Sequence, residues 1–187
     1  MKTSSLLLIS TILLAACGGT GSSHTLDVTI EGGAGKTIRL DRTVGRSVVT
    51  MDSVTLDANG KGSLSTAHLP LDFYYLNFDR GNYLVLALDS TDGARVAAKA
   101  DGLGKASSVE GHKDAVVLFN FLKSADVYRT SRDSIRNIVN NGGDPSAMDA
   151  FNKLNTEHFE RCKQLVKDNP GSPVQLAAIS QIDQSTE

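Results

Sequence analysis

"FYYLNFDRGNYLVLAL", residues Phe73 to Leu88, is the stretch of sequence that decides the fold. Apolar and polar side chains alternate on both sides of a short linker, Asp79 to Asn82, and a period of two is the signature of strands that bury one face. We therefore expect two neighbouring strands joined by a turn. The side chains that we place together are Tyr74, Leu76 and Phe78 on one face of the first strand, and Leu84, Leu86 and Leu88 on the core face of the second.

The same period recurs in the segments on either side. Leu26, Val28 and Ile30 alternate with polar neighbours, and further short runs have the character of strands. These runs are Thr37 to Leu40, Ser47 to Leu56 with a break expected at Met51-Asp52, a strand after Gly62, and Arg95 to Ala100. Short strands at intervals of roughly 8–12 residues predict an antiparallel β-sandwich or open barrel. We assign residues 25–110 to this β domain.

After Gly111 the apolar spacing becomes that of helices. The apolar residues that share a face in the first helical segment are Val117, Phe121, Ala125, Tyr128, Ile135, Ile138 and Val139. Those that form the stripe of the second segment are Phe151, Leu154, Phe159, Cys162, Leu165 and Val166. This pattern predicts a helical hairpin.

Cap and breaker residues set the ends of these helices. Asn140 to Gly143 ends the first helix, Asp144 caps the second with Pro145 at its first position, and Asn169 to Gly171 ends the second. A short third helix follows Ser172-Pro173. We therefore predict an α+β fold, in which the antiparallel β-sandwich or open barrel precedes a C-terminal helical hairpin and a short third helix over residues 111–187.

The N-terminus has the pattern of a lipoprotein signal. Lys2 precedes an apolar run, Leu6 to Leu14, that is too short to cross a bilayer as a helix, which needs roughly 20 residues. The run closes with Leu14-Ala15-Ala16-Cys17, which resembles the bacterial lipobox, in which the cysteine is acylated. We predict that residues 1–16 are a signal peptide, that Cys17 is lipidated, and that residues 17–24 form a flexible tether. The alternative is an ordinary secretory peptide with a chance cysteine.

Charge excludes some classes of partner. Removal of Lys2 with the signal peptide leaves 18 basic and 21 acidic residues, a net charge of −3, without a basic cluster. This balance argues against a nucleic-acid partner and against a polybasic membrane patch. After lipidation of Cys17, Cys162 is the one remaining thiol, so the chain has neither an internal disulfide nor a Cys-x-x-Cys pair.

"IEGGAGKTI", residues 30–38, resembles a phosphate-binding loop but lacks its essential parts. A P-loop has a glycine five residues before its Gly-Lys-Thr triplet and a helix after it. Here Ile30 occupies the glycine position, and Thr37 to Asp41 reads as a strand, so the amide groups and dipole of a helix N-terminus are missing. We expect no nucleotide at this site. Gly32, Gly33 and Gly35 suit a hairpin turn with positive φ angles.

Other motifs also favour structure over chemistry. Asp57 to Gly62 has the spacing of a calcium loop, but Lys61 stands where an oxygen ligand is needed and His68 where a glutamate is needed, so we expect a hairpin turn. No pair of histidines has metal-ligand spacing. Asp52-Ser53 lacks a nucleophile elbow, although a triad with a distant histidine stays open.

Cys162 lies on the apolar stripe of its helix, and we expect a buried, inert thiol. We predict no catalytic residue, no metal site and no cofactor for this chain.

The order of these features resembles the N-terminal domain of many lipoproteins of Bacteroidota, catalogued as domain of unknown function 4369. The residues that carry the resemblance are Gly35 to Leu40, Asp52-Ser53, Asn59 to Gly62, Phe73 to Leu76, and Asn169 to Pro173. In that family a thioredoxin-like domain with a Cys-x-x-Cys pair often follows. The present sequence ends at Glu187 without such a pair, so no redox residue can be transferred.

The resemblance also implies a location. Lipoproteins of these bacteria that reach the cell exterior tend to carry acidic residues soon after the acylated cysteine, and this tether has none before Asp27. We therefore expect an outer-membrane lipoprotein that faces the periplasm and contacts the membrane through its lipid.

Three functions are compatible with the sequence. The first is a non-catalytic, lipid-anchored module with a periplasmic protein partner. The second is the accessory part of a thiol–disulfide oxidoreductase whose thioredoxin-like domain is missing from this chain. The third is a small-ligand binder that uses Phe73 and Tyr75, although these aromatic side chains would more often pack under the helical hairpin.

Overall fold

The computed structural model of the chain describes residues 24–79, 81–142 and 146–183. Eight strands come first: β1 (Thr25–Glu31), β2 (Thr37–Val44), β3 (Ser47–Thr55), β4 (Lys61–Ser65), β5 (Asp72–Asp79), β6 (Asn82–Leu88), β7 (Ala94–Lys99) and β8 (Ser108–Glu110). A short 3₁₀ turn, η1 (Leu103–Lys105), separates the last two strands. Three helices follow: α1 (Lys113–Asn140), α2 (Ser146–Asp168) and α3 (Val174–Asp183).

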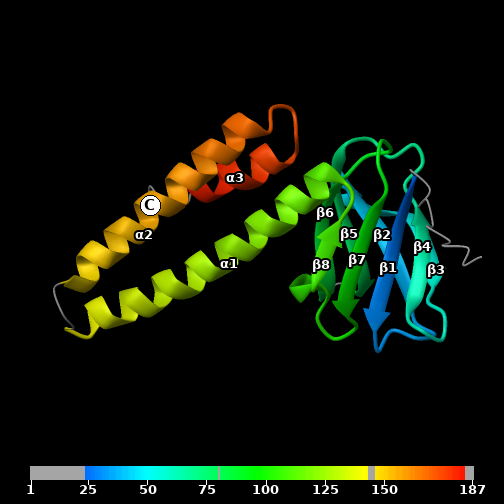
Figure 1. Cartoon of the computed structure of the whole chain (residues 1–187), viewed down its shortest axis with the longest axis horizontal. Helices are drawn as coiled ribbons and strands as arrows, with labels where there is room; N and C mark the ends of the chain where they lie inside the picture. Colours follow the sequence, from blue (N-terminus) through cyan, green and yellow to red (C-terminus); the bar gives the residue numbers. More distant parts are fainter. Residues whose placement is uncertain (1–23, 80, 143–145, 184–187) are drawn as a thin grey trace, which may run out of the picture.

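The strands form two four-stranded sheets that face each other as a sandwich (Figure 1). One sheet has the order β4-β1-β7-β8 and the other has the order β3-β2-β5-β6. The predicted α+β sandwich with C-terminal helices is therefore confirmed. One pairing differs from the antiparallel prediction, because β1 runs parallel to β7, with Leu26 opposite Ala94. A period of two reports which face is buried and carries no information on strand direction.

The core lies between the inner faces of the two sheets. Alternate residues on each strand point into it, as the sequence period predicts. The predicted core residues of β1, β5 and β6 are buried at 0–4% exposure: Leu26, Val28, Ile30, Tyr74, Leu76, Leu84, Leu86 and Leu88. Phe78 is partly buried and packs against the same cluster.

The two glycine-rich turns are corners between the sheets, and the hairpin prediction for them is wrong. Residues 32–36 connect β1 to β2, and residues 56–60 connect β3 to β4. In both cases the two connected strands belong to different sheets. The corners bind each other, since the Gly35 amide donates to the Leu56 carbonyl at 3.0 Å and the Ile30 amide donates to the Gly60 carbonyl at 2.8 Å. Gly32 and Gly35 have the expected positive φ, whereas Gly33 does not. The strand predicted after Lys36 is β2.

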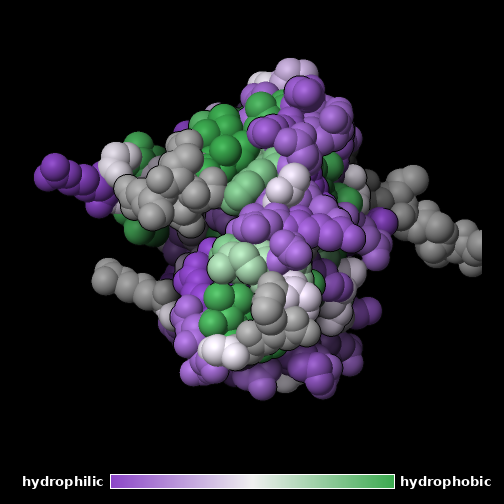
Figure 2. Space-filling view, turned by 90° about the vertical axis from the view of Figure 1, so that its left-hand side faces the viewer, coloured by the Kyte–Doolittle hydropathy of each residue, from purple (hydrophilic) through white to green (hydrophobic). Residues whose placement is uncertain are grey.

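The helices form the predicted hairpin with a short third helix. α1 leads away from the sandwich and α2 returns alongside α1. α3 packs against α1 and α2 near the sheets (Figure 1). Gly142, with a φ of 72°, follows α1 as the stop signal predicts. The predicted cap residues Asp144 and Pro145 lie outside the described residues. Seen from the free end of the hairpin, the surface is mostly hydrophilic, with apolar side chains in separate patches (Figure 2).

A single polar junction fixes the start of α1 to the sandwich. His112 is the N-cap of α1 and is 3% exposed, and its Nδ1 accepts a hydrogen bond from the Ala115 amide at 3.5 Å. Its Nε2 lies 2.9 Å from Oδ1 of Asp89, the residue after β6. Burial alone would raise the pKa of Asp89, but hydrogen bonds from Thr91 and His112 outweigh burial and hold this pKa below its ordinary value.

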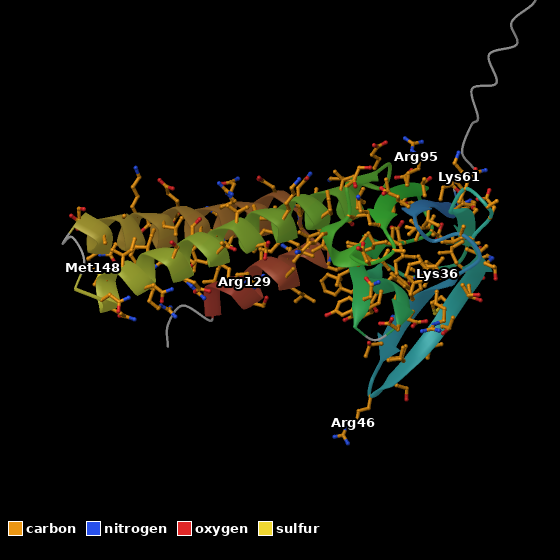
Figure 3. The ribbon with its side chains drawn as sticks, turned by 90° about the horizontal axis from the view of Figure 1, so that it is seen from below. Lys36, Arg46, Lys61, Arg95, Arg129 and Met148 are labelled. Atoms are coloured by element: carbon orange, nitrogen blue, oxygen red, sulfur yellow. The ribbon has the colours of Figure 1, made fainter. Side chains whose placement is uncertain are left out.

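The hairpin of β2 and β3 projects beyond the rest of the sandwich, with Arg46 at its tip (Figure 3). β2 pairs with β5 only from Arg39 to Arg42, so the residues beyond Arg42 form a two-stranded ribbon. Met51 is an extra residue in β3, because Leu40 lies opposite Asp52 while Asp41 lies opposite Thr50. The break expected at Met51-Asp52 is therefore a β-bulge.

Replacement of Gly60 tests the contact between the two corners. Gly60 has a φ of 73°, and a Cβ there would overlap the Ile30 carbonyl oxygen. Gly45 has a φ of 61° with open space around it, so Gly45→Ala reports the backbone strain alone, about 1 kcal/mol. We expect Gly60→Ala to lower the free energy of unfolding by about 1–3 kcal/mol more than Gly45→Ala, because the corner must also shift. Urea denaturation of both variants measures the difference, and equal losses would contradict the role of this contact.

Candidate functional site

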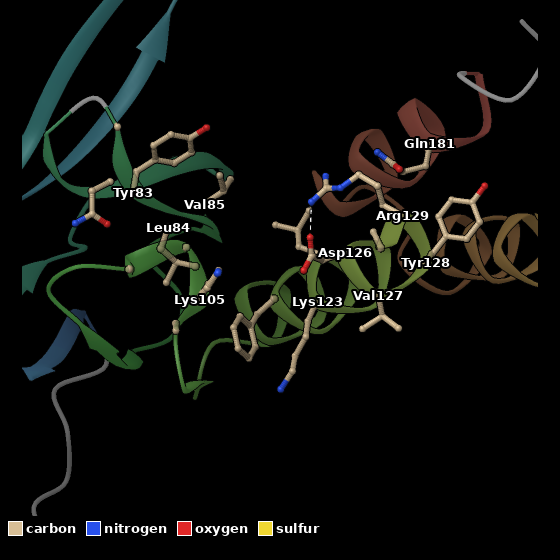
Figure 4. A pocket seen from close by; sticks show the side chains of 18 of the residues that line it. Tyr83, Leu84, Val85, Lys105, Lys123, Asp126, Val127, Tyr128, Arg129 and Gln181 are labelled. Atoms are coloured by element: carbon tan, nitrogen blue, oxygen red, sulfur yellow. Dashed lines mark hydrogen bonds and ion pairs between the residues drawn. The ribbon is translucent and has the colours of Figure 1, made fainter. Parts of the chain in front are cut away.

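The candidate site is a groove where α1 leaves the sandwich. It has a volume of about 1060 Å³ and lies between the edge strand β6, the loop around η1, the middle of α1 and the end of α3 (Figure 4). The groove forms because α1, at 28 residues or roughly 42 Å, is much longer than its contact with the sheet. Beyond that contact the helix diverges from β6 and leaves an open space.

The first turns of α1 are held by apolar packing on the outer face of the second sheet. Leu118 and Val117 pack with Ala87 of β6 and with Phe73 of β5. Val174 and Ala177 of α3 join the same cluster. Phe73 therefore packs under the helices, which is the alternative that the sequence analysis gave for it. It no longer supports the interpretation of the protein as a small-ligand binder.

One asparagine positions the loop that forms the opposite wall. The side chain of Asn82 donates from Nδ2 to the Ala100 carbonyl at 2.6 Å, and its Oδ1 accepts from the Leu103 amide at 2.9 Å. Leu103 is fully buried beneath this loop. Asn82 thus ties η1 to β6 and places Lys105 at the rim of the groove (Figure 4).

The floor of the groove is apolar and open to solvent. Tyr83 is 44% exposed, Leu122 is 37% exposed and Val127 is 62% exposed. Tyr83 also makes an edge-to-face contact with Tyr75, with ring centroids 5.6 Å apart. Exposed large apolar side chains that gather in one concave place are typical of a binding surface.

The charges around this floor are mainly positive. Four basic side chains and two acidic ones line the groove: Lys105, Lys123, Arg129, Arg132, Asp101 and Asp126. Arg129 is paired with Asp126, and Arg132 is paired with Asp133. Neither Lys105 nor Lys123 has an ion-pair partner among the described residues. The groove therefore offers two ammonium groups and one carboxylate, that of Asp101, without ion-pair partners among the described residues, on a chain whose net charge is −2.

A second cluster lies between α1 and α2. The rings of Tyr128 and His158 stack with centroids 3.7 Å apart and an interplanar angle of 4°. Nε2 of His158 lies 3.6 Å from Sγ of Cys162, and the Tyr128 hydroxyl donates to Oδ1 of Asn155 at 2.9 Å. Cys162 is fully buried, so the burial predicted for this thiol is confirmed.

The electrostatics of this cluster oppose nucleophilic chemistry. Burial raises the pKa of the Cys162 thiol, and it lowers the pKa of His158, which Arg161 and Arg132 lower further. Both groups are thereby held in their neutral forms. A cysteine nucleophile needs the thiolate, usually next to a protonated histidine, and this pair has the opposite bias.

The remaining sequence candidates have structural partners. Oδ1 of Asp52 accepts from the Ser53 amide and Oδ2 accepts from the Ser65 amide, both at 2.7 Å, so this carboxylate ties β3 to β4. Oδ1 of Asp57 accepts from the amides of Asn59 and Lys61 at 2.8 Å, which closes its turn. In the described part of the chain, three or more potential metal ligands do not gather at any point. The predicted lipidation site Cys17 lies outside the described residues.

Comparisons with known proteins add no identification. A scan against protein-family models, a search of curated proteins and a search of solved structures each found no match to this chain. The resemblance to the lipoprotein domain of Bacteroidota stays a prediction.

The titration of His158 predicts that acid destabilises the helical hairpin. Because its pKa is lower in the folded chain, the unfolded chain binds more protons, and stability falls as the pH drops below the unfolded pKa of about 6.5. We expect His158→Phe, which keeps a stacking ring, to flatten this part of the pH profile. His68→Asn, at an exposed histidine, is the control. Urea midpoints followed by helical circular dichroism test this, and parallel profiles for the wild type and His158→Phe would contradict it.

Proposed function

We propose that this chain is a lipid-anchored, non-catalytic protein-interaction module of the bacterial cell envelope, and that the groove beside α1 holds a segment of its partner. The observation that carries the proposal is the combination of an open apolar floor with two unpaired lysines. An apolar side chain of the partner would cover Tyr83 and Leu122, and acidic side chains beside it would approach Lys105 and Lys123. Charge complementarity of this kind gives an interface its orientation and its association rate.

The shape of the groove favours a protein segment over a small molecule. Sites for small ligands enclose most of the ligand surface. Here the floor residues stay between 37% and 62% exposed, so a small molecule would remain largely in water. An extended or helical segment can instead lie along the length of the groove and cover it.

The anchor rests on the sequence pattern that ends at Cys17. Several acyl chains on one residue hold a protein stably on a membrane. Among the helices of the described residues, none is long and apolar enough to span a bilayer. By the resemblance described above, the anchored domain would face the periplasm from the outer membrane.

Replacement of Cys17 tests the anchor. We expect Cys17→Ser to move the protein from the membrane fraction to the soluble fraction of the envelope, because the acylated thiol is lost. Cys162→Ser is the matched control, since that thiol is buried and should leave the fractionation unchanged. Membrane association of the Cys17→Ser protein in high salt would contradict the lipid anchor.

Site-specific photo-crosslinking tests the groove. A photoreactive residue at Leu122 should capture one partner in intact envelopes, whereas the same residue at Ile138, which is 48% exposed but outside the groove, should not. Lys105→Glu combined with Lys123→Glu should abolish the Leu122 product by repelling an acidic partner. Lys153→Glu combined with Lys163→Glu on α2 is the charge-matched control.

The outcome also separates the two leading functions. A thioredoxin-like protein crosslinked at Leu122 would favour the accessory part of a thiol–disulfide oxidoreductase. Equal products at Leu122 and Ile138, or a Leu122 product that survives the charge reversal, would overturn the groove as the binding site.

A further inference from the structure

The first half of β3 is an exposed sheet edge. β3 stands at the end of its sheet, and its residues from Ser47 to Met51 are all exposed. Val48 is 66% exposed, Val49 is 43% exposed and Met51 is 38% exposed. The opposite strand adds Val44, which is 51% exposed. Several of the larger exposed apolar side chains of the chain therefore lie on one projecting hairpin.

The other edge strands of the described residues are protected. β8 has three residues and β4 has five, and Lys61 stands at the start of β4. β6 contacts η1, and α1 packs on its outer face. Short length, lysine and a covering helix are common protections of sheet edges against pairing with another chain.

β3 lacks these protections over five residues. Ser47-Val48-Val49-Thr50-Met51 contains neither charge nor proline, and three of its members are residues that favour strands. The bulge at Met51 limits the unprotected stretch, because beyond it Asp52 binds the Ser65 amide of β4. The exposed backbone edge thus runs from the tip of the hairpin to the bulge.

The ribbon formed by this part of β2 and β3 has little support of its own. Beyond Arg42 it lacks a third strand, and its apolar side chains on both faces are exposed. An isolated two-stranded ribbon is marginally stable in water, whereas additional strands stabilise it.

We propose that β3 pairs with β3 of a second copy of this chain, antiparallel about a two-fold axis near Val49, so that the β3-β2-β5-β6 sheets of the two copies join into one. The charges at the two ends of the stretch Ser47 to Met51 favour a second copy of this chain as the partner. Arg46 stands at one end without an ion-pair partner among the described residues, and Asp52 stands at the other end. An antiparallel arrangement brings the positive end of each copy toward the negative end of the other.

The same symmetry makes the contact self-complementary. In a two-fold interface the same patch serves both partners, and pairs of valine and threonine across two antiparallel strands stabilise each other. The middle of the stretch is uncharged, so the two copies meet without like-charge repulsion. This pairing uses a surface separate from the groove and does not depend on the function proposed above.

Disulfide trapping tests the geometry. In the full chain, purified in mild detergent, Val49→Cys should form a covalent dimer under gentle oxidation, because the axis places the two cysteines opposite each other. Leu176→Cys is the control, since Leu176 is 64% exposed on α3 and lies outside the groove. Covalent dimer at Val49 in clear excess over Leu176 supports the proposal, and equal trapping at the two positions overturns it.

Sedimentation equilibrium tests the association without a crosslink. The wild type should reach twice the mass of the chain as concentration rises, and Val49→Lys should stay monomeric because it places two ammonium groups at the axis. Leu176→Lys should associate as the wild type does. Circular dichroism checks that Val49→Lys keeps its fold, which its exposed position allows. A wild type that is monomeric throughout, or a Val49→Lys protein that still dimerises, overturns the proposal.

Discussion

The contact between Asp89 and His112, together with the apolar packing of the first turns of α1 on the second sheet, joins the two halves of the molecule. Asp89 follows the strand β6 and His112 caps the helix α1, so one hydrogen-bonded pair, with its atoms 2.9 Å apart, joins the end of an edge strand to the start of a 28-residue helix. A helix of that length amplifies any change of angle at its first turn. The groove lies beyond this junction, whereas α2 and α3 are held by their own apolar contacts with α1.

Burial and charge act in opposite ways at the two polar sites. Between α1 and α2, burial keeps His158 and Cys162 neutral, so a histidine and a thiol in contact serve as packing groups. In the groove, Lys105 and Lys123 remain in water, where ammonium groups are available for a partner. A histidine and a thiol are thus held in an environment that suppresses their reactivity, whereas the two lysines of the groove stay accessible.

Local patterns predicted the faces of the strands and the ends of the helices, because burial with a period of two and cap residues depend only on neighbours along the chain. Tyr74 and Leu86 are buried for this reason. Such patterns do not specify strand partners, so the sequence predicts hairpins at Gly35 and Gly60 where the structure has corners between the sheets. The groove could not be predicted, because its walls come from four distant segments, and Asn82 carries no local signal for its contact with the loop near Leu103.

The parallel pairing of β1 with β7 has a consequence for how the protein folds. Five strands lie between β1 and β7 along the chain, so β1 lacks one of its two neighbours until Ala94 pairs with Leu26. Contacts between residues so far apart in sequence carry a large entropic cost of loop closure and slow the search for the native state. The helices, whose contacts are largely local, can form early. Closure of the sandwich is therefore expected to be the slow step of folding. The strands of the β domain then fold cooperatively and not one after another.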